Sequence, residues 1–162
     1  MTQPRIEIIP KKSLIGKSIR MSLANNKTRE LWRSFMVEKD AIKNPTSKDL
    51  FSIQVYDDLL YFKNFSAQTE FTKWAAIAVD SIENIPNGFE SFTLEGGLYA
   101  IFLHKGPANE FQRTFQFIFG QWLPNSEYAI DDRPHFELLG AKYKNNDPTS
   151  EEEVWIPIKK KY

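Results

Sequence analysis

The order of the predicted secondary-structure elements constrains this chain more than any other feature, because the same order occurs twice. Each half follows strand, helix, strand, strand, with an offset between the halves of about 80 to 85 residues. The first unit covers about residues 5–82 and the second about residues 89–160. Identity between the halves is low, so the repeat is one of pattern more than of sequence. The matched positions are Gly16 with Gly97, Phe35 with Phe115, Phe51 with Phe136, and Trp74 with Trp155.

The first half contains one predicted helix and three predicted strands. Residues 25–42 carry an apolar stripe that is typical of a helix, and Asn26 or Thr28 can cap it. The stripe consists of Leu31, Trp32, Phe35 and Met36. Strands are expected at residues 5–23, with a break at Pro10, at 50–57 and at 71–82.

The second half repeats this order after a linker at residues 85–91, where Asn87 and Gly88 predict a turn. Pro107 is suited to the first turn of a helix over residues 107–123. The apolar face of this helix is predicted to consist of Phe111, Phe115, Ile118, Phe119 and Trp122. Strands are expected at residues 96–106, 135–143 and 153–160.

These elements predict an α+β fold in a single domain over residues 1–162. The architecture we expect is a tandem duplicated pair of strand–helix–strand–strand units with pseudo-two-fold symmetry. One helix covers one face of each small sheet, so the other faces need another cover. If the two halves face each other, they leave a central ligand cleft at the pseudo-two-fold axis.

Composition narrows the classes of function. Lys plus Arg and Asp plus Glu both number 21, and this zero net charge argues against direct nucleic acid binding. The chain has no Cys and only His104 and His135, so we expect no metal site and no cofactor. No secretory signal and no apolar run near the roughly 18 residues of a membrane span is present. These features predict a cytoplasmic protein that does not bind membranes.

Alternation of side chains along the strands selects candidates for the cleft. Alternation predicts that Ala75, Ile77 and Val79, Ala100 and Phe102, and Val154, Ile156 and Ile158 face the helices. The same rule, applied to strands 50–57 and 135–143, assigns Phe51, Ile53, Val55, Phe136 and Leu138 to that core. The opposite faces then collect Glu137, Tyr56, Tyr99, Trp74 and Trp155.

One carboxylate among four amphipathic aromatic side chains suits a flat or cationic organic ligand, since ring faces attract cations by roughly 0.5–2 kcal/mol each. If Glu137 is buried without a partner, its pKa should rise, and a cationic ligand would relieve the cost. Three alternatives stay open. Glu137 could point to solvent, the tryptophans could pack on a loop or a dimer partner, and Arg20 could pair with Glu137.

Several stretches resemble a known family when taken in order. They are "IPNGFESFTLEGGLYAIFLHKGP" (85–107), "FQFIFGQWLPNSEYAIDDRPHFELL" (115–139) and "EEEVWIPIK" (151–159), with "ELWRSF" and "FSIQVYD" in the first half. They resemble the gyrase-inhibitor-like small-molecule-binding domain, which is also the effector-binding domain of AraC-type and MerR-type transcriptional regulators. The resemblance covers nearly the whole chain.

The resemblance implies two such units around a cleft, with the family's key acid at Glu137. In drug-binding members this acid meets cationic, aromatic ligands. Tyr99 and Trp122 also fall on motif positions. His135 stands where many members carry Asp, and Leu139 stands where Tyr is frequent, which affects the ligand spectrum rather than the fold. No DNA-binding segment is recognised, so the chain looks like a stand-alone member.

Three functions are therefore considered. The first is a stand-alone protein that senses or sequesters lipophilic, cationic or planar aromatic small molecules such as drugs or toxins. Its partner would be a small-molecule ligand, and its predicted ligand-binding residues are Glu137, Tyr99, Trp122, Trp74, Tyr56 and Trp155. We favour this function over an enzyme.

The second function is hydrolysis of reactive electrophilic compounds. Glu137 would then be catalytic as the general base on water, with Tyr99 or Tyr56 donating a hydrogen bond to the developing anion. The third is a protein-interaction regulator, such as a topoisomerase inhibitor or a detached regulator subunit. The acidic run 151–153 and the basic tail 159–161 would serve it. A homodimer or a partner regulator protein is left open.

Overall fold

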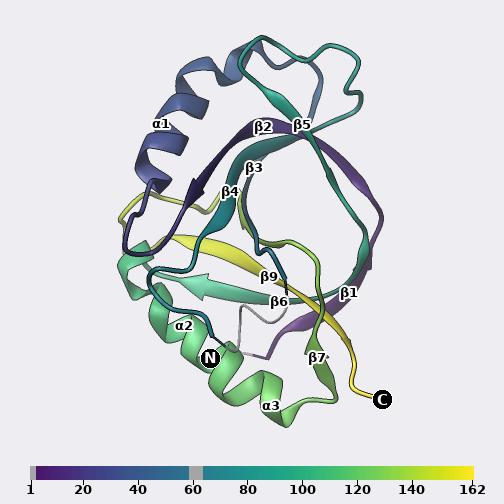
Figure 1. Ribbon diagram of the computed structural model, residues 1–162, viewed down its shortest axis with the longest axis vertical. Coiled ribbons are helices and arrows are strands. Elements are labelled where there is room, and N and C mark those ends of the chain that lie inside the picture. The colour runs from purple at the N-terminus through teal and green to yellow at the C-terminus, as the bar shows by residue number, and fades with distance from the viewer. Residues whose placement is uncertain (1–2, 59–63) are drawn as a thin grey trace.

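Two principal helices and one large antiparallel sheet form this protein (Figure 1). The computed structural model describes residues 3–58 and 64–162. In this part of the chain the strands are β1 (Arg5–Ile9), β2 (Lys12–Met21), β3 (Pro45–Val55), β4 (Phe71–Val79), β5 (Glu90–Leu94), β6 (Gly97–Lys105), β7 (Tyr128–Ile130), β8 (His135–Leu139) and β9 (Glu151–Lys160). The α-helices are α1 (Thr28–Glu38), α2 (Phe111–Phe117) and the single turn α3 (Leu123–Asn125). The helices within the described ranges are too short or too polar to cross a bilayer.

The predicted elements are present with shifted bounds. Most are shorter, but β3 begins five residues before the predicted strand 50–57 and β9 begins two residues before the predicted strand 153–160. The first strand breaks around Pro10, as expected, because β1 ends at Ile9 and β2 begins at Lys12. Asn26 Oδ1 accepts a hydrogen bond of 3.0 Å from the backbone N–H of Thr28, where α1 begins. Two short strands were not predicted, namely β5 with five residues and β7 with three.

The second predicted helix is interrupted. After α2, residues Ile118–Trp122 form a π-helical turn, and α3 follows. The wider turn changes which side chains face the sheet. Thr114 and Ile118 are buried, whereas Phe115 is 37% exposed. Phe35, by contrast, is fully buried. The predicted match between Phe35 and Phe115 therefore does not extend to their burial.

The strand order of the sheet is β1-β6-β9-β8-β3-β4-β2-β5, and β7 pairs with β9. This order reads the same from either end when β1, β2, β3 and β4 are exchanged with β5, β6, β8 and β9. The first strand of each half crosses over, because β1 pairs with β6 and β5 pairs with β2. At the centre, β3 pairs with β8. The two halves of the sequence thus meet in one continuous sheet.

The sheet curls around an apolar inner face. Ile9 on β1 and Leu94 on β5 lie at opposite edges of the sheet, yet both belong to the same buried cluster. The centre of this cluster is an aromatic stack in which the rings of Phe136 and Trp155 lie 5.1 Å apart at 17°. Edge strands that share one core must bend toward each other, which accounts for the ring-like path of the strands in Figure 1.

Both principal helices pack on the outer face. Helix α1 covers Ala75 and Ile77 of β4, and the α2 segment covers Phe102 of β6 and Val154 of β9. These two layers are separate apolar clusters. The middle of the outer face, where β3 and β8 pair, lies between them.

Candidate functional site

Glu137 lies in the middle of the outer face. It is directly opposite Ser52 on β3 and Val154 on β9, and directly opposite residues of an antiparallel pair project from the same face. Val154 belongs to the layer under α2, and Ser52 is in turn opposite Ala75, which lies under α1. Glu137 therefore lies between the two helix-covered layers, and it is only 8% exposed.

Two side chains from neighbouring strands hold the Glu137 carboxylate. Gln54 Nε2 on β3 donates a hydrogen bond of 2.9 Å to Glu137 Oε1, and Lys73 Nζ on β4 lies 3.8 Å from the same oxygen. Gln54 and Lys73 are directly opposite each other in the sheet, and both are buried. The alternative partner Arg20 pairs with Asp57 at 2.8 Å instead. Glu137 is thus not solvent-facing but belongs to a buried polar cluster.

Burial dominates the electrostatics of this cluster. It raises the pKa of Glu137, although the Lys73 charge and the Gln54 hydrogen bond oppose the rise. Burial also lowers the pKa of Lys73. The Glu152 carboxylate on β9 interacts electrostatically with Glu137 and Lys73. Burial of Glu152, together with the Glu137 charge, raises the pKa of Glu152 to about 7. A buried acid, Glu137, and a half-buried acid, Glu152, thus interact with Lys73, so the cluster favours either a proton or an added cation.

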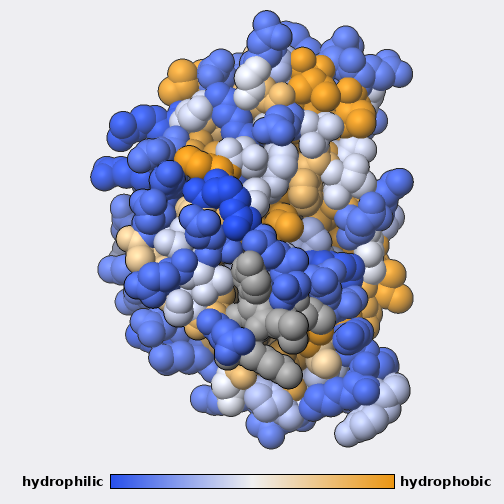
Figure 2. Space-filling model, viewed as in Figure 1, coloured by the Kyte–Doolittle hydropathy of each residue, from blue (hydrophilic) through white to orange (hydrophobic). Residues whose placement is uncertain are grey.

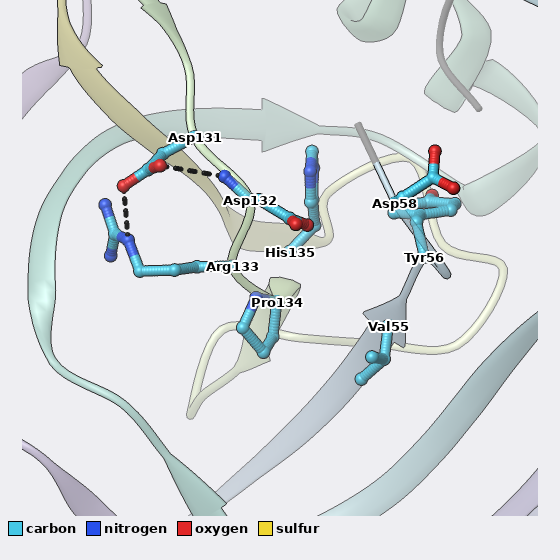
Figure 3. Close-up of a pocket in the computed structure, with 8 residues that line it drawn as sticks. All are labelled: Val55, Tyr56, Asp58, Asp131, Asp132, Arg133, Pro134 and His135. Atoms are coloured by element: carbon cyan, nitrogen blue, oxygen red, sulfur yellow. Dashed lines mark hydrogen bonds and ion pairs between the residues drawn. The ribbon is translucent and has the colours of Figure 1, made fainter. Parts of the chain in front are cut away.

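Tyr56 follows β3 on this same face and contacts His135, with 5.1 Å between ring centroids. Burial and the Glu137 charge raise the pKa of Tyr56. Burial, with a smaller effect of the Arg133 charge, lowers the pKa of His135 to about 3, so the imidazole is neutral. Tyr56 and His135 line a pocket of about 90 Å³, in which Asp58 lies on the Tyr56 side (Figure 3).

The loop before β8 is anchored by Arg133. Figure 3 shows its guanidinium turned toward Asp131, to which it donates a hydrogen bond of 2.9 Å. The guanidinium also donates to the carbonyls of Leu98 and Ile158 and lies 4.7 Å from the centre of the Tyr99 ring. These contacts fix the start of β8 and hence the position of Glu137, the third residue of that strand.

Three of the predicted cleft aromatics lie on the other face. Trp74, Tyr99 and Trp155 are buried in the inner cluster, and Tyr99 donates a hydrogen bond of 2.8 Å to the Pro134 carbonyl there. The prediction that they share one face with Glu137 and Tyr56 is wrong. Alternation was read correctly, but in β3 and β8 the apolar residues face the inner cluster rather than the helices. A ligand role for the three stays a prediction.

Trp122 lies on the outer side, but within the α2 layer. Its ring packs against Phe102 at 5.2 Å and stacks on Tyr128 at 6.1 Å. It also lines a shallow hollow of about 370 Å³ together with Gln121 and Ser126. The structure therefore brings Tyr56 close to Glu137 but places Trp122 in a separate layer.

Sequence reasoning missed Lys73, Gln54 and Glu152 as members of the site. Lys73 was detectable, because it is the one charged residue in the apolar run "FTKWAAIAV" of β4. Gln54 was given no role. Glu152 was considered only as part of the acidic run 151–153, but the run lies within β9 and Glu153 pairs with Arg5 at 2.9 Å.

The basic tail is exposed. Lys160 pairs with Glu127, and Lys161 Nζ donates to the Pro124 carbonyl. Figure 2 shows the described residues of the viewed face as mainly hydrophilic, with hydrophobic residues in small separate groups.

Residues 5–158 match the model of a protein family described as the integron-associated effector binding protein. The chain belongs to this family. The resemblance to the gyrase-inhibitor-like effector-binding domain is thereby confirmed. The fold of this effector-binding protein also agrees with solved structures at low sequence identity.

The structure of SAV2435 bound to tetraphenylphosphonium has a TM-score of 0.72 at 13% identity, over 98% of this chain and 94% of the other. A hydrolase from Listeria innocua has a TM-score of 0.61 at 12% identity, over 97% and 92% of the two chains. The transcriptional regulator BrlR of Pseudomonas aeruginosa is 29% identical over 90 residues. That match covers 55% of this chain and 33% of the regulator, so the two share only a part of the regulator's length.

Proposed function

We propose that this effector-binding protein binds lipophilic cations, with or without planar aromatic groups, at the outer face of the sheet. The observation that carries the proposal is the Glu137 carboxylate, buried between the layers of α1 and α2 with a raised pKa. A buried carboxylate attracts a cation more strongly than an exposed one, since water screens it less. The relative SAV2435, described as bound to tetraphenylphosphonium, supports this ligand class.

We further infer that the chain is a duplicated pair of units and that the ligand cleft lies between them. The palindromic strand order supports duplication, because each strand of one half has a counterpart in the other. Glu137 from the second half and Gln54 from the first meet where the halves join. Glu137 is 8% exposed, so a ligand reaches it only when the side chains around it move.

Tyr56 is the aromatic ligand contact that this proposal favours, because it shares the outer face with Glu137. Its ring packs against Phe71 and His135, and the Glu137 charge contributes to its raised pKa. Trp74, Tyr99 and Trp155 support the sheet from the inner side. In this assignment they position β8 and β9 and do not touch the ligand.

The test measures the binding of tetraphenylphosphonium to wild type and to Glu137→Gln, by calorimetry and by thermal shift. The variant should lose about tenfold or more in affinity, equivalent to about 1.4 kcal/mol, because it removes a buried opposite charge. Glu127→Gln is the matched control, since Glu127 also pairs with a lysine but is exposed. Equal affinity in wild type and Glu137→Gln would refute the electrostatic role.

Hydrolysis of electrophilic compounds is a second candidate. It is favoured by the combination of a buried acid of raised pKa, suited to a general base, and the Tyr56 hydroxyl on the same face. Tyr99 is removed from this role, because its hydroxyl is on the inner side and bonded to Pro134. Product formation beyond one equivalent of protein, abolished in Glu137→Gln, would establish the activity. Stoichiometric binding without turnover would exclude it for the compound used.

A further inference from the structure

We infer that Lys73 is the protein's own cation in this site, and that a cationic ligand binds by displacing the Lys73 ammonium from Glu137. The inference rests on the proposed function and adds the step that limits binding. It follows from the arrangement of Lys73, Gln54 and Glu137, three buried side chains on three neighbouring strands.

The two contacts to the carboxylate are unequal. Gln54 makes a hydrogen bond of 2.9 Å to Glu137 Oε1, whereas Lys73 Nζ lies 3.8 Å from that atom, beyond hydrogen-bond distance. If the ammonium leaves, the carboxylate stays oriented by the amide. The amide oxygen Oε1 of Gln54 is buried without a hydrogen-bond partner, so this side chain also has an acceptor to offer. The lysine is therefore the replaceable partner.

The cost of burial differs between the two cations. An ammonium is compact and strongly hydrated, so burying it is expensive, and burial lowers the pKa of Lys73 accordingly. A lipophilic cation spreads its charge over aromatic groups and loses less hydration when it is buried. The flexible four-carbon stem lets Lys73 move its ammonium toward water while β4 stays in place. Exchange of the one cation for the other keeps Glu137 paired.

The charged and titratable groups around Lys73 are compatible with this exchange. Glu152 on β9 interacts electrostatically with Lys73, so its carboxylate can pair with the ammonium after displacement. His135 on β8 is neutral. His104 on β6 is held by Thr114 at 2.7 Å and by the Pro107 carbonyl at 3.2 Å. Tyr56 stays protonated, because burial and the Glu137 charge raise its pKa.

The exchange predicts selectivity for size as well as charge. A small inorganic cation would have to pay the same dehydration cost as the ammonium, so it gains nothing over Lys73. A neutral aromatic compound leaves the Lys73–Glu137 pair intact and finds the space between the layers closed. Only a bulky cation replaces the pair and fills the space.

The decisive variant is Lys73→Met, which keeps the length of the side chain and removes its charge. Tetraphenylphosphonium should bind about tenfold more tightly to Lys73→Met than to wild type. Titrations are done at neutral and at alkaline pH, because loss of Lys73 raises the pKa of Glu137 further and protonation would hide the gain. Lys160→Met is the matched control, since Lys160 forms an exposed pair with Glu127, and its affinity should equal that of wild type.

A second measurement uses the wild-type protein and does not depend on the folding of the variant. Acylation of individual lysines is followed by mass spectrometry with and without tetraphenylphosphonium. Displacement should expose the Lys73 amine and accelerate its acylation, with Lys160 unchanged.

The outcomes separate the inference from the proposed function. Unchanged or weaker binding in a folded Lys73→Met at both pH values, or slower acylation of Lys73 with bound ligand, overturns the inference. If wild type then still binds and Glu137→Gln does not, the proposed function stands. If neither wild type nor Lys73→Met binds the probe, both are overturned. Tighter binding by Lys73→Met than by wild type, together with faster acylation of Lys73 in ligand-bound wild type, supports the inference most directly.

Discussion

Gln54 Nε2 donates a hydrogen bond to Glu137 Oε1 at 2.9 Å, although the two residues are 83 positions apart in the sequence. The bond crosses the seam between β3 and β8, where the first half of the chain meets the second. It aims the carboxylate from one half with an amide from the other. The site therefore exists only when both halves are folded and in register.

Replacement of Gln54 by Met should destabilise the protein mainly at alkaline pH. The variant removes a donor to a buried carboxylate, which costs about 1–3 kcal/mol when the carboxylate is ionised. At acid pH Glu137 is protonated and the loss is smaller. Denaturant unfolding at acid and alkaline pH measures both values. A loss of stability independent of pH would mean that packing, and not the bond to Glu137, is what Gln54 contributes.

Glu152 makes the protein less stable as the pH rises. Its ordinary pKa of 4.5 is raised to about 7 in the folded state, so ionisation between these values disfavours the fold. The cost at high pH is up to about 3 kcal/mol, reduced by solvent screening because Glu152 is partly exposed. Glu152→Gln should therefore gain stability over wild type as the pH rises from 4.5 to about 7. Unfolding of both proteins across this range tests it, and parallel pH profiles would contradict it.

His135 acts in the opposite direction. Its pKa falls from 6.5 to about 3 on folding, so its contribution is complete above 6.5 and is lost as the pH falls toward about 3. The lost stability is about 5 kcal/mol at most. His135→Asn should flatten the acid limb of the stability curve. NMR titration gives an independent check, because the imidazole of folded wild type should stay neutral at pH values where an exposed histidine is protonated.

Much of the fold could be predicted from the sequence, because it depends on local pattern. The break at Pro10 and the Gly88 turn, with φ of 86°, follow from single residues. The helix-facing sides of β4 and β9 follow from alternation, and Ala75 and Val154 lie where it places them.

The composition of the site could not be predicted in the same way. Alternation divides a strand into two faces but does not say which face meets the helices when both are buried. In β3, Ile53 faces the inner cluster and Gln54 the space between the helix layers, so the apolar face was assigned to the wrong side. The pairing of Lys73 with Glu137 depends on the register of three strands, which is a tertiary property.

The close approach of β2 and β4 makes Gly16 essential to the sheet. A Cβ at Gly16 would lie 2.1 Å from the Ala75 carbonyl oxygen and 2.7 Å from Ala76 Cβ, and neither atom belongs to a flexible side chain. Gly16→Ala should therefore cost about 3 kcal/mol or more, since the backbone must shift. Gly120 is the control, because a Cβ there meets nothing within 4 Å, and Gly120→Ala should be neutral or stabilise by up to about 1 kcal/mol. Thermal and urea unfolding of both variants decides this, and equal stability of the two would show that β2 and β4 can separate without cost.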